Sequence, residues 1–259
     1  SPPRTPGNRH RVVRPPGPDT TGLRGAPGDT FTTLGTLLAG VEGDPATYGP
    51  MGTDLVGAAD PNDPRPGLAA EITAALEAGR ACLDITGAWT MDGEVEFSSG
   101  SLPIDHVPTI VDARAACIEY DGDGWLFTND NTRDAGCALR GENFQLYGGF
   151  WLSTGDPDGF VRIVDSGGCR LYPNQTRGWT ASGKDAVVYQ LEEGERWCES
   201  NHLGGRHHLL DVGVRSTASR GTSFQDTLVD SIHLSQCSRY GFDLSGNWID
   251  CTFLNPTLV

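Results

Sequence analysis

The residues best suited to chemistry are carboxylates, and the densest group of them lies between residues 189 and 202. This segment, Tyr189-Gln-Leu-Glu-Glu-Gly-Glu-Arg-Trp-Cys-Glu-Ser-Asn-His202, joins four acids to an arginine and a tryptophan. Carboxylates accept hydrogen bonds from sugar hydroxyls, and an indole face stacks on the C–H side of a sugar ring. We therefore expect Glu195, Arg196 and Trp197 to contact a glycan, and the alternative is an exposed turn with one anchoring Trp.

Paired carboxylates could also cleave a glycan. Breaking a glycosidic bond requires one acid to protonate the leaving oxygen and a second carboxylate that acts as base or nucleophile. The chain contains 34 acidic residues, most of which must be solvated surface groups, so the sequence does not identify the pair. Candidates are Glu193, Glu199, Asp226 and Asp230, from a wider set that adds Asp165, Glu192, Glu195 and Asp211.

A metal or cofactor site is not expected. Cys198, His202, His207 and His208 suggest zinc by composition, but adjacent histidines on a strand point to opposite faces and do not easily serve one ion. The sequence has no Gly-x-Ser-x-Gly, P-loop or dinucleotide-binding fingerprint, so serine hydrolase, NTPase and Rossmann functions have no support.

From about residue 81, short apolar alternations cut by Gly, Asn and Asp predict many strands of four to six residues. Such spacing indicates a sandwich, a barrel or a solenoid. The expected strands are 82–85, 95–97, 116–120, 125–127, 144–147, 160–164, 169–172, 186–189, 209–214, 231–235, 241–244 and 248–253.

The C-terminal segment 232–256 favours the solenoid. It alternates strand triplets with turns that contain Gly or Asn, and three strands in two dozen residues make one coil. Each coil buries its inward residues only against its neighbours, so the ends of the stack need caps. Leu68, Ile72, Ala75 and Leu76 recur at helical spacing and Gly79 can end the helix, so residues 68–78 are expected to form the N-terminal cap.

The order of helix, glycine and strand, followed by Trp89-Thr-Met-Asp-Gly-Glu-Val-Glu-Phe97, resembles the opening of pectate-lyase-like β-helix proteins, the superfamily that includes bacteriophage tailspikes. The later Ile-x-Leu-Ser-x-Cys and Gly-Phe-x-Leu-x-Gly units resemble that family's coils. The resemblance covers about residues 68–259. It implies an all-β fold, a right-handed parallel β-helix with a short capping helix.

Residues 1–67 hold twelve of the 17 prolines and are expected to form an extended arm before the β-helix domain at 68–259. Arg4, Arg9, Arg11 and Arg14 precede the first acid, Asp19, and make the terminus locally basic, suited to anchoring on an acidic neighbour. An arm before a β-helix resembles a phage spike or tail fibre subunit. That resemblance implies a homotrimer on the virion surface, attached through residues 1–67 to other virion proteins.

The net charge of −15 opposes phosphate-directed nucleic-acid binding, and no apolar run is long enough to insert into a membrane. Seven cysteines without a CxxC pair predict buried free thiols rather than a disulfide framework, with Cys237 and Cys251 on strands. The leading hypothesis is recognition of a host-surface polysaccharide. The alternatives are a polysaccharide depolymerase, either hydrolase or lyase, and a purely architectural decoration or baseplate protein.

Overall fold

The structure is a computed structural model that describes residues 53–55, 66–77, 82–97, 110–129, 144–194, 198–218 and 223–259. All of these belong to one compact unit, Asp44–Val259. The basic residues Arg4, Arg9, Arg11 and Arg14 lie outside the described residues, so the arm stays a prediction. Within 1–67 the structure describes residues 53–55 and 66–67, and the first of these pieces is β1 (Thr53–Leu55), which pairs with the first long strand of the domain.

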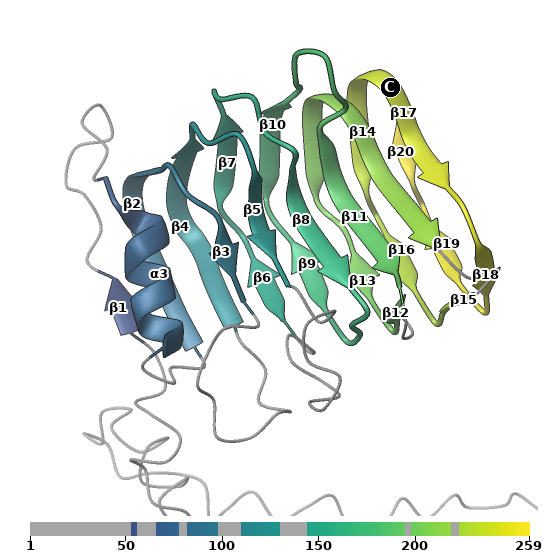
Figure 1. The fold of residues 1–259 in the computed structure, drawn as a ribbon, viewed down its shortest axis with the longest axis horizontal. Helices are drawn as coiled ribbons and strands as arrows, with labels where there is room; N and C mark the ends of the chain where they lie inside the picture. The colour runs from purple at the N-terminus through teal and green to yellow at the C-terminus, as the bar shows by residue number, and fades with distance from the viewer. Residues whose placement is uncertain are drawn as a thin grey trace, which may run out of the picture. The chain divides into compact units, whose positions relative to one another are not determined.

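The described chain is a parallel β-solenoid of about five turns with one short helix, which confirms the predicted fold class (Figure 1). Hydrogen-bonded strands from successive coils stack into three faces. Face A contains β1, the start of β2 (Cys82–Met91), the start of β4 (Ile110–Tyr120), β6 (Gln145–Tyr147), β9 (Arg170–Tyr172), β13 (His202–Leu203), β16 (Leu228–Asp230) and β19 (Thr252–Leu254).

Faces B and C follow face A around each coil. Face B contains the ends of β2 and β4, then β7 (Phe150–Ser153), β10 (Gln175–Trp179), the starts of β14 (Arg206–Ala218) and β17 (His233–Leu244), and β20 (Thr257–Leu258). Face C contains β3 (Val95–Glu96), β5 (Trp125–Thr128), β8 (Gly159–Val164), β11 (Val187–Glu193) and the ends of β14 and β17. A small sheet of β12 (Cys198–Glu199), β15 (Ser223–Gln225) and β18 (Asn247–Ile249) completes the later coils.

Helix α3 (Leu68–Glu77) packs against β2 and β3 in the first coil. Its apolar positions lie on one side, since Leu68, Ile72 and Ala75 are all buried. The helix therefore covers the apolar end of the first coil, as the spacing predicts. Gly79 and the side chain of Leu76 lie outside the described residues.

The interior is filled by a chain of aromatic rings that crosses several coils. The buried Phe160 ring lies 5.0 Å from Trp179, 5.5 Å from Trp151, and 6.3 Å from both Phe127 and Tyr189, measured between centroids. These rings come from β5, β7, β8, β10 and β11. Each coil is thus held by side chains of the coils on either side of it.

Corners between the faces are made by residues with left-handed backbone. Gly168, Ser200, Asp226 and Asp250 occupy equivalent corners just before face A, with φ of 70°, 57°, 50° and 53°. Ser and Asp tolerate this conformation because their short polar side chains can bond locally. The expected strand 248–253 is therefore wrong as one element, because Asp250 turns the chain between β18 and β19.

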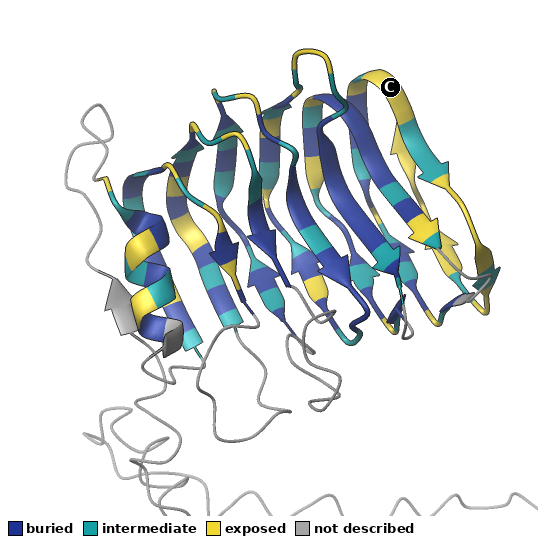
Figure 2. Ribbon diagram, in the orientation of Figure 1, coloured by how far each residue is buried: buried dark blue, intermediate teal, exposed yellow. Residues whose placement is uncertain are grey.

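The last coil exposes apolar side chains, because the structure places no further coil over it (Figure 2). Phe253 and Leu258 continue columns that are buried in earlier coils, yet they are 39% and 59% exposed. Cys237 and Cys251, expected to be buried, are only half-buried for the same reason. The expectation of buried thiols is also wrong for Cys117, which is exposed, and Cys82 is half-buried, whereas Cys169 and Cys198 are fully buried. All six described cysteines are free thiols.

Candidate functional site

The outer side of face C carries a polar ladder, defined here as Arg162, Gln190, Glu192, Arg215, Thr217 and Asp243. Four of its members, Arg162, Gln190, Arg215 and Asp243, pair in register across β8, β11, β14 and β17. Glu192 and Thr217 form a second register pair two residues further along. Because neighbouring parallel strands lie about 4.8 Å apart, the ladder repeats polar groups at that interval along the solenoid.

Side chains of the ladder bond to one another across coils. Arg162 donates two hydrogen bonds to Glu192, from Nε at 2.9 Å and from a terminal nitrogen at 2.7 Å. Gln190 Nε2 donates to Thr217 Oγ1 at 3.0 Å. Bidentate guanidinium–carboxylate pairs fix the geometry of both partners, so the ladder is ordered before any ligand arrives.

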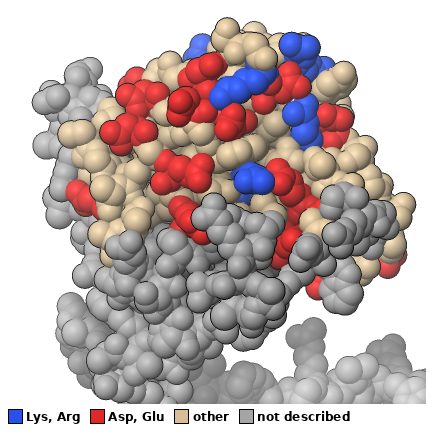
Figure 3. Space-filling view, in the orientation of Figure 1, with Lys and Arg blue, Asp and Glu red and all other residues tan. Residues whose placement is uncertain are grey.

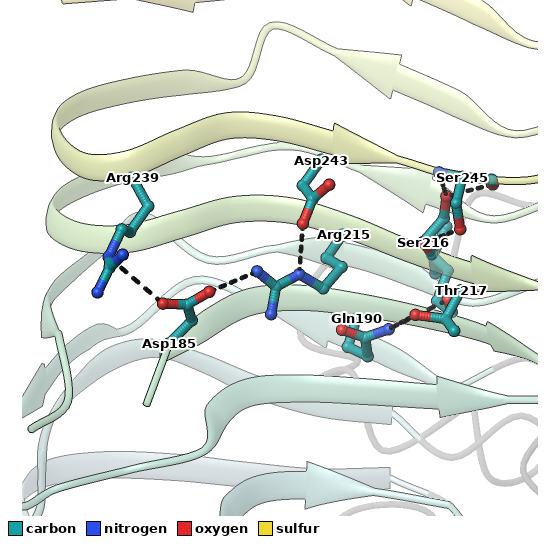
Figure 4. A network of polar contacts seen from close by, with 9 residues as sticks. Asp185, Gln190, Arg215, Ser216, Thr217, Arg239, Asp243 and Ser245 are labelled. Carbon is teal, nitrogen blue, oxygen red and sulfur yellow. Dashed lines mark hydrogen bonds and ion pairs between the residues drawn. The ribbon is translucent and has the colours of Figure 1, made fainter. Parts of the chain in front are cut away.

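Arg215 is the centre of the ladder (Figure 4). It donates hydrogen bonds to Asp243 and to Asp185, each at 2.8 Å. Asp185 also forms an ion pair with Arg239, with 3.4 Å between Oδ1 and Nε. Partial burial acts to lower the pKa of Arg215, but its bonds to Asp185 and Asp243 outweigh that effect and leave the pKa raised. Seen in the orientation of Figure 1, this surface mixes both charges and acidic groups predominate (Figure 3).

A second group of charges lies near the start of face C. Lys184, the only lysine of the chain, binds Asp158 Oδ1 at 2.7 Å and the backbone oxygen of Asp123 at 2.9 Å. These two bonds of Lys184 connect neighbouring coils beside the ladder.

Burial raises the pKa of Glu94, and the nearby charges of Glu96 and Asp158 add to that, although a bond from the Trp125 backbone opposes it.

Two acids of the wider candidate set stabilise the fold. Asp211 is buried and accepts hydrogen bonds from the backbone of Ala181 at 2.9 Å and Ala186 at 3.2 Å, and from Ser238 Oγ. It therefore holds the 180–186 loop against β14 and β17. Asp165 is buried with φ of 48° and accepts from Gly194 N at 2.7 Å.

Replacing Asp211 with alanine is expected to lower the free energy of unfolding by about 2–3 kcal/mol, because the buried amide of Ala186, the partly buried amide of Ala181 and the Ser238 hydroxyl lose their acceptor. Asp158→Ala is the matched control, since it removes a partly exposed carboxylate whose ion pair is worth up to about 1 kcal/mol. Urea unfolding of both variants checks this. An Asp211 variant no less stable than the Asp158 variant would contradict the assigned role.

The four candidate catalytic residues occupy different environments. Glu193 ends β11 and is 1% exposed. Glu199 lies in β12 and pairs with Gln225 of the neighbouring coil. Asp226 is the next residue of that coil and has a left-handed backbone conformation. Asp230 lies at the far end of β16 and accepts from Ser231 Oγ at 2.9 Å. Glu199 and Asp226 are thus near neighbours, while the length of face A separates Asp230 from them.

Glu193 lies beside a buried thiol. Burial is the largest cause that raises the pKa of Cys198 well above its ordinary value, and the nearby groups of Cys169, Glu193 and Asp165 act in the same direction. Such a thiol is poorly nucleophilic. The predicted glycan contacts Glu195, Arg196 and Trp197 lie outside the described residues and stay predictions.

The adjacent histidines point to opposite faces, as predicted. His207 is fully buried, with Thr176 Oγ1 at 2.9 Å from Nδ1 and the Gly204 oxygen at 3.1 Å from Nε2. His208 is partly exposed and bonds to Ser235 Oγ. Among the described residues, no group of three or more His, Cys, Asp or Glu side chains is arranged to hold a metal ion.

Most of the ladder was missed from the sequence, and only Glu192 had been named. A usable signal was present, because Arg162 stands alone among apolar neighbours in Phe160-Val-Arg-Ile-Val164. A charged residue at the centre of an apolar strand must face outward or be paired, and Arg162 is both.

Comparison with known proteins finds no matching family model, and no curated protein or solved structure matches the chain. The fold and the ladder together define a parallel β-solenoid with an ordered polar outer face. The described part of the chain holds no helix with the length and hydrophobicity that a membrane crossing requires.

Proposed function

We propose that this protein recognises a polysaccharide along the polar ladder of face C. The observation that carries the proposal is the register column of Arg162, Gln190, Arg215 and Asp243 on four successive coils. Its strands lie about 4.8 Å apart, similar to the length of a sugar unit in an extended glycan. Arg162, Arg215 and Asp243 present donors and acceptors along this row, whereas Gln190 is buried and bonds to Thr217.

The bonding within the ladder supports this proposal. An arginine has five donor hydrogens, and the bonds of Arg215 to Asp243 and Asp185 use only Nε and one terminal nitrogen, which leaves donors for sugar hydroxyls. Side chains already fixed by their neighbours lose little entropy when a ligand binds. Asp243 and Arg162 are 43% and 34% exposed, so a ligand can reach both ends of the column.

We further propose that the protein is a spike or tail fibre subunit of a phage virion. The support is the resemblance of its first coil to tailspike β-helices and the basic arm that precedes it. In this proposal residues 1–67 attach to other virion proteins, three copies assemble, and the solenoid meets the polysaccharide of the host surface.

The test is direct binding to a panel of bacterial surface polysaccharides, measured by isothermal titration calorimetry. We expect at least one to bind, and the double variant Arg162→Ala/Asp243→Ala to weaken that binding by roughly 10-fold or more through lost hydrogen bonds. The matched control is Asp112→Ala/Arg114→Ala, which removes an exposed arginine–aspartate pair from face A and is expected to bind like the wild type.

Two results would overturn the proposal: no binding to any member of the panel, or equal weakening by the face C variant and the face A control. Circular dichroism melting of both variants separates loss of a contact from loss of the fold. New reducing ends or unsaturated products in the same mixtures would add catalysis to recognition.

A further inference from the structure

A cationic strip, defined here as Arg177, Arg206, His208 and His233, lies on the outer side of face B. Arg206 pairs in register with His233, and Arg177 pairs with His208, so the strip extends over β10, β14 and β17. The intervening residue of β14, His207, is buried, which places Arg206 and His208 on the outside. Both arginines are exposed and both histidines are partly exposed.

The arginines of the strip differ from those of the polar ladder, because no acid of the described residues forms an ion pair with them. Each ladder arginine is paired with a carboxylate, whereas neither Arg177 nor Arg206 has an ion-pair partner within the described ranges. Glu119 of β4 is the nearest carboxylate in register on this face, and Leu152 of β7 stands between it and Arg177.

The electrostatics of His208 agree with this arrangement. Burial is the first cause that lowers its pKa, followed by the charges of His233, Arg177 and Arg206, and no acid opposes them. An anion placed among these like-charged groups would reduce their mutual repulsion.

We propose that the cationic strip binds the anionic groups of an acidic glycan, the carboxylate, sulfate or phosphate substituents of a saccharide chain. This surface is separate from the polar ladder. The strip is a second glycan-binding surface, on face B, and this inference stands on its own residues and does not depend on the ladder.

The geometry suits a chain of acidic sugars. Arg177 and Arg206 can each bind an oxyanion through two parallel N–H donors. They lie on adjacent strands and are offset by two residues, because Arg177 pairs with His208 and Arg206 with Gln175. Phe150 and Leu152 of β7 adjoin Gln175 and Arg177 in register and are partly exposed. An aromatic ring beside cationic groups can hold a sugar ring while its charged substituent meets a guanidinium.

A saccharide fits this surface better than a nucleic acid. Binding a phosphate backbone requires an extended basic surface, and the strip offers four cationic groups on a strongly acidic protein. Spaced single charges on a sugar chain need only a small positive area.

The test measures binding to polygalacturonate and to dextran sulfate by biolayer interferometry at low ionic strength, with neutral dextran and single-stranded DNA as comparisons. We expect one or both anionic polysaccharides to bind, dextran not to bind, and Arg177→Gln/Arg206→Gln to weaken binding by roughly 10-fold or more. The matched control is Arg114→Gln/Arg170→Gln, two exposed arginines of face A, with binding unchanged.

Binding is also expected to tighten as the pH falls below about 6.5, since protonation of His208 adds charge beside Arg177 and Arg206, with the neutral Ser235 as the other polar neighbour. Burial and the nearby positive groups lower the pKa of His208, so the increase comes below the ordinary histidine range. The variant His208→Gln should lose that increase and keep the arginine-dependent part. Unchanged binding in Arg177→Gln/Arg206→Gln, no binding to either anionic polysaccharide, or tighter binding to DNA would each overturn the inference. Because Arg162→Ala/Asp243→Ala leaves the strip intact, failure of the ladder proposal and failure of this one give different results.

Discussion

Replacing Phe160 with alanine is expected to lower the free energy of unfolding by about 4 kcal/mol, within the usual range for deletion of a buried aromatic ring. Phe160 is fully buried and contacts four other rings, from β5, β7, β10 and β11. Its removal leaves a cavity in the core between coils that bury their apolar side chains only against one another. Equilibrium unfolding in urea measures the effect.

Tyr240→Ala is the control for this variant, because Tyr240 is an aromatic residue that is 54% exposed. We expect a loss of about 1 kcal/mol or less at that position, typical of surface substitutions. An equal loss of unfolding free energy in the two variants would mean that the buried aromatic rings around Phe160 do not hold successive coils together.

Stability is expected to fall as the pH is lowered from about 6.5 towards 3 because of His207. Burial lowers the pKa of His207 to about 3 from its ordinary 6.5, and the positive neighbours His208 and His233 add to this, although the bond to Gly204 opposes it. Between these values the unfolded chain binds a proton that the folded chain does not. The contribution of the neutral histidine to the free energy of unfolding is therefore fully present above about pH 6.5. Protonation of this histidine in the unfolded chain lowers the free energy of unfolding by on the order of 4 kcal/mol by pH 3.

The matched variant replaces the buried pair as a unit, His207→Leu with Thr176→Val, so that neither polar partner is left unsatisfied. Urea midpoints measured from pH 7 to pH 4 should fall less steeply for the variant than for the wild type. Carboxylates titrate in both proteins, so the difference between the two slopes isolates the histidine. Parallel slopes would contradict the predicted effect of burial.

The coil architecture was predictable because each coil repeats the same local rule. Short apolar strands separated by Gly, Asn or Asp are too short for the sheets of a sandwich. They bury their inward side chains by stacking on the strands of neighbouring coils. The strand expected at 169–172 agrees with β9 within one residue, and Leu68, Ile72 and Ala75 form the buried side of α3 as their spacing indicates.

Strands with mixed or polar composition were not predictable by the same rule. β10 contains Gln175, Thr176, Arg177 and Gly178, and only its place between β7 and β14 gives these residues a strand conformation. Asp226 was read as a candidate acid, whereas the structure places it at a corner where the backbone itself needs a tolerant residue.

The polar ladder and the cationic strip depend on register, which the sequence does not display. Loops of unequal length separate Arg162, Gln190, Arg215 and Asp243, so no fixed period connects them. Their alignment appears only when the coils are stacked. By contrast, the opposite orientation of His207 and His208 follows from strand geometry alone and is confirmed.

Recognition of a polysaccharide by the outer faces of the solenoid is the central claim, and a crystal structure with a bound oligosaccharide tests it most directly. The oligosaccharide should be cut from the polysaccharide that binds most tightly in titration. We predict sugar units along β8, β11, β14 and β17 on face C, with hydrogen bonds to Arg162, Arg215 or Asp243. Acidic substituents of a second glycan chain are predicted on face B. A ligand bound only to face A or only at an end of the solenoid would contradict the claim.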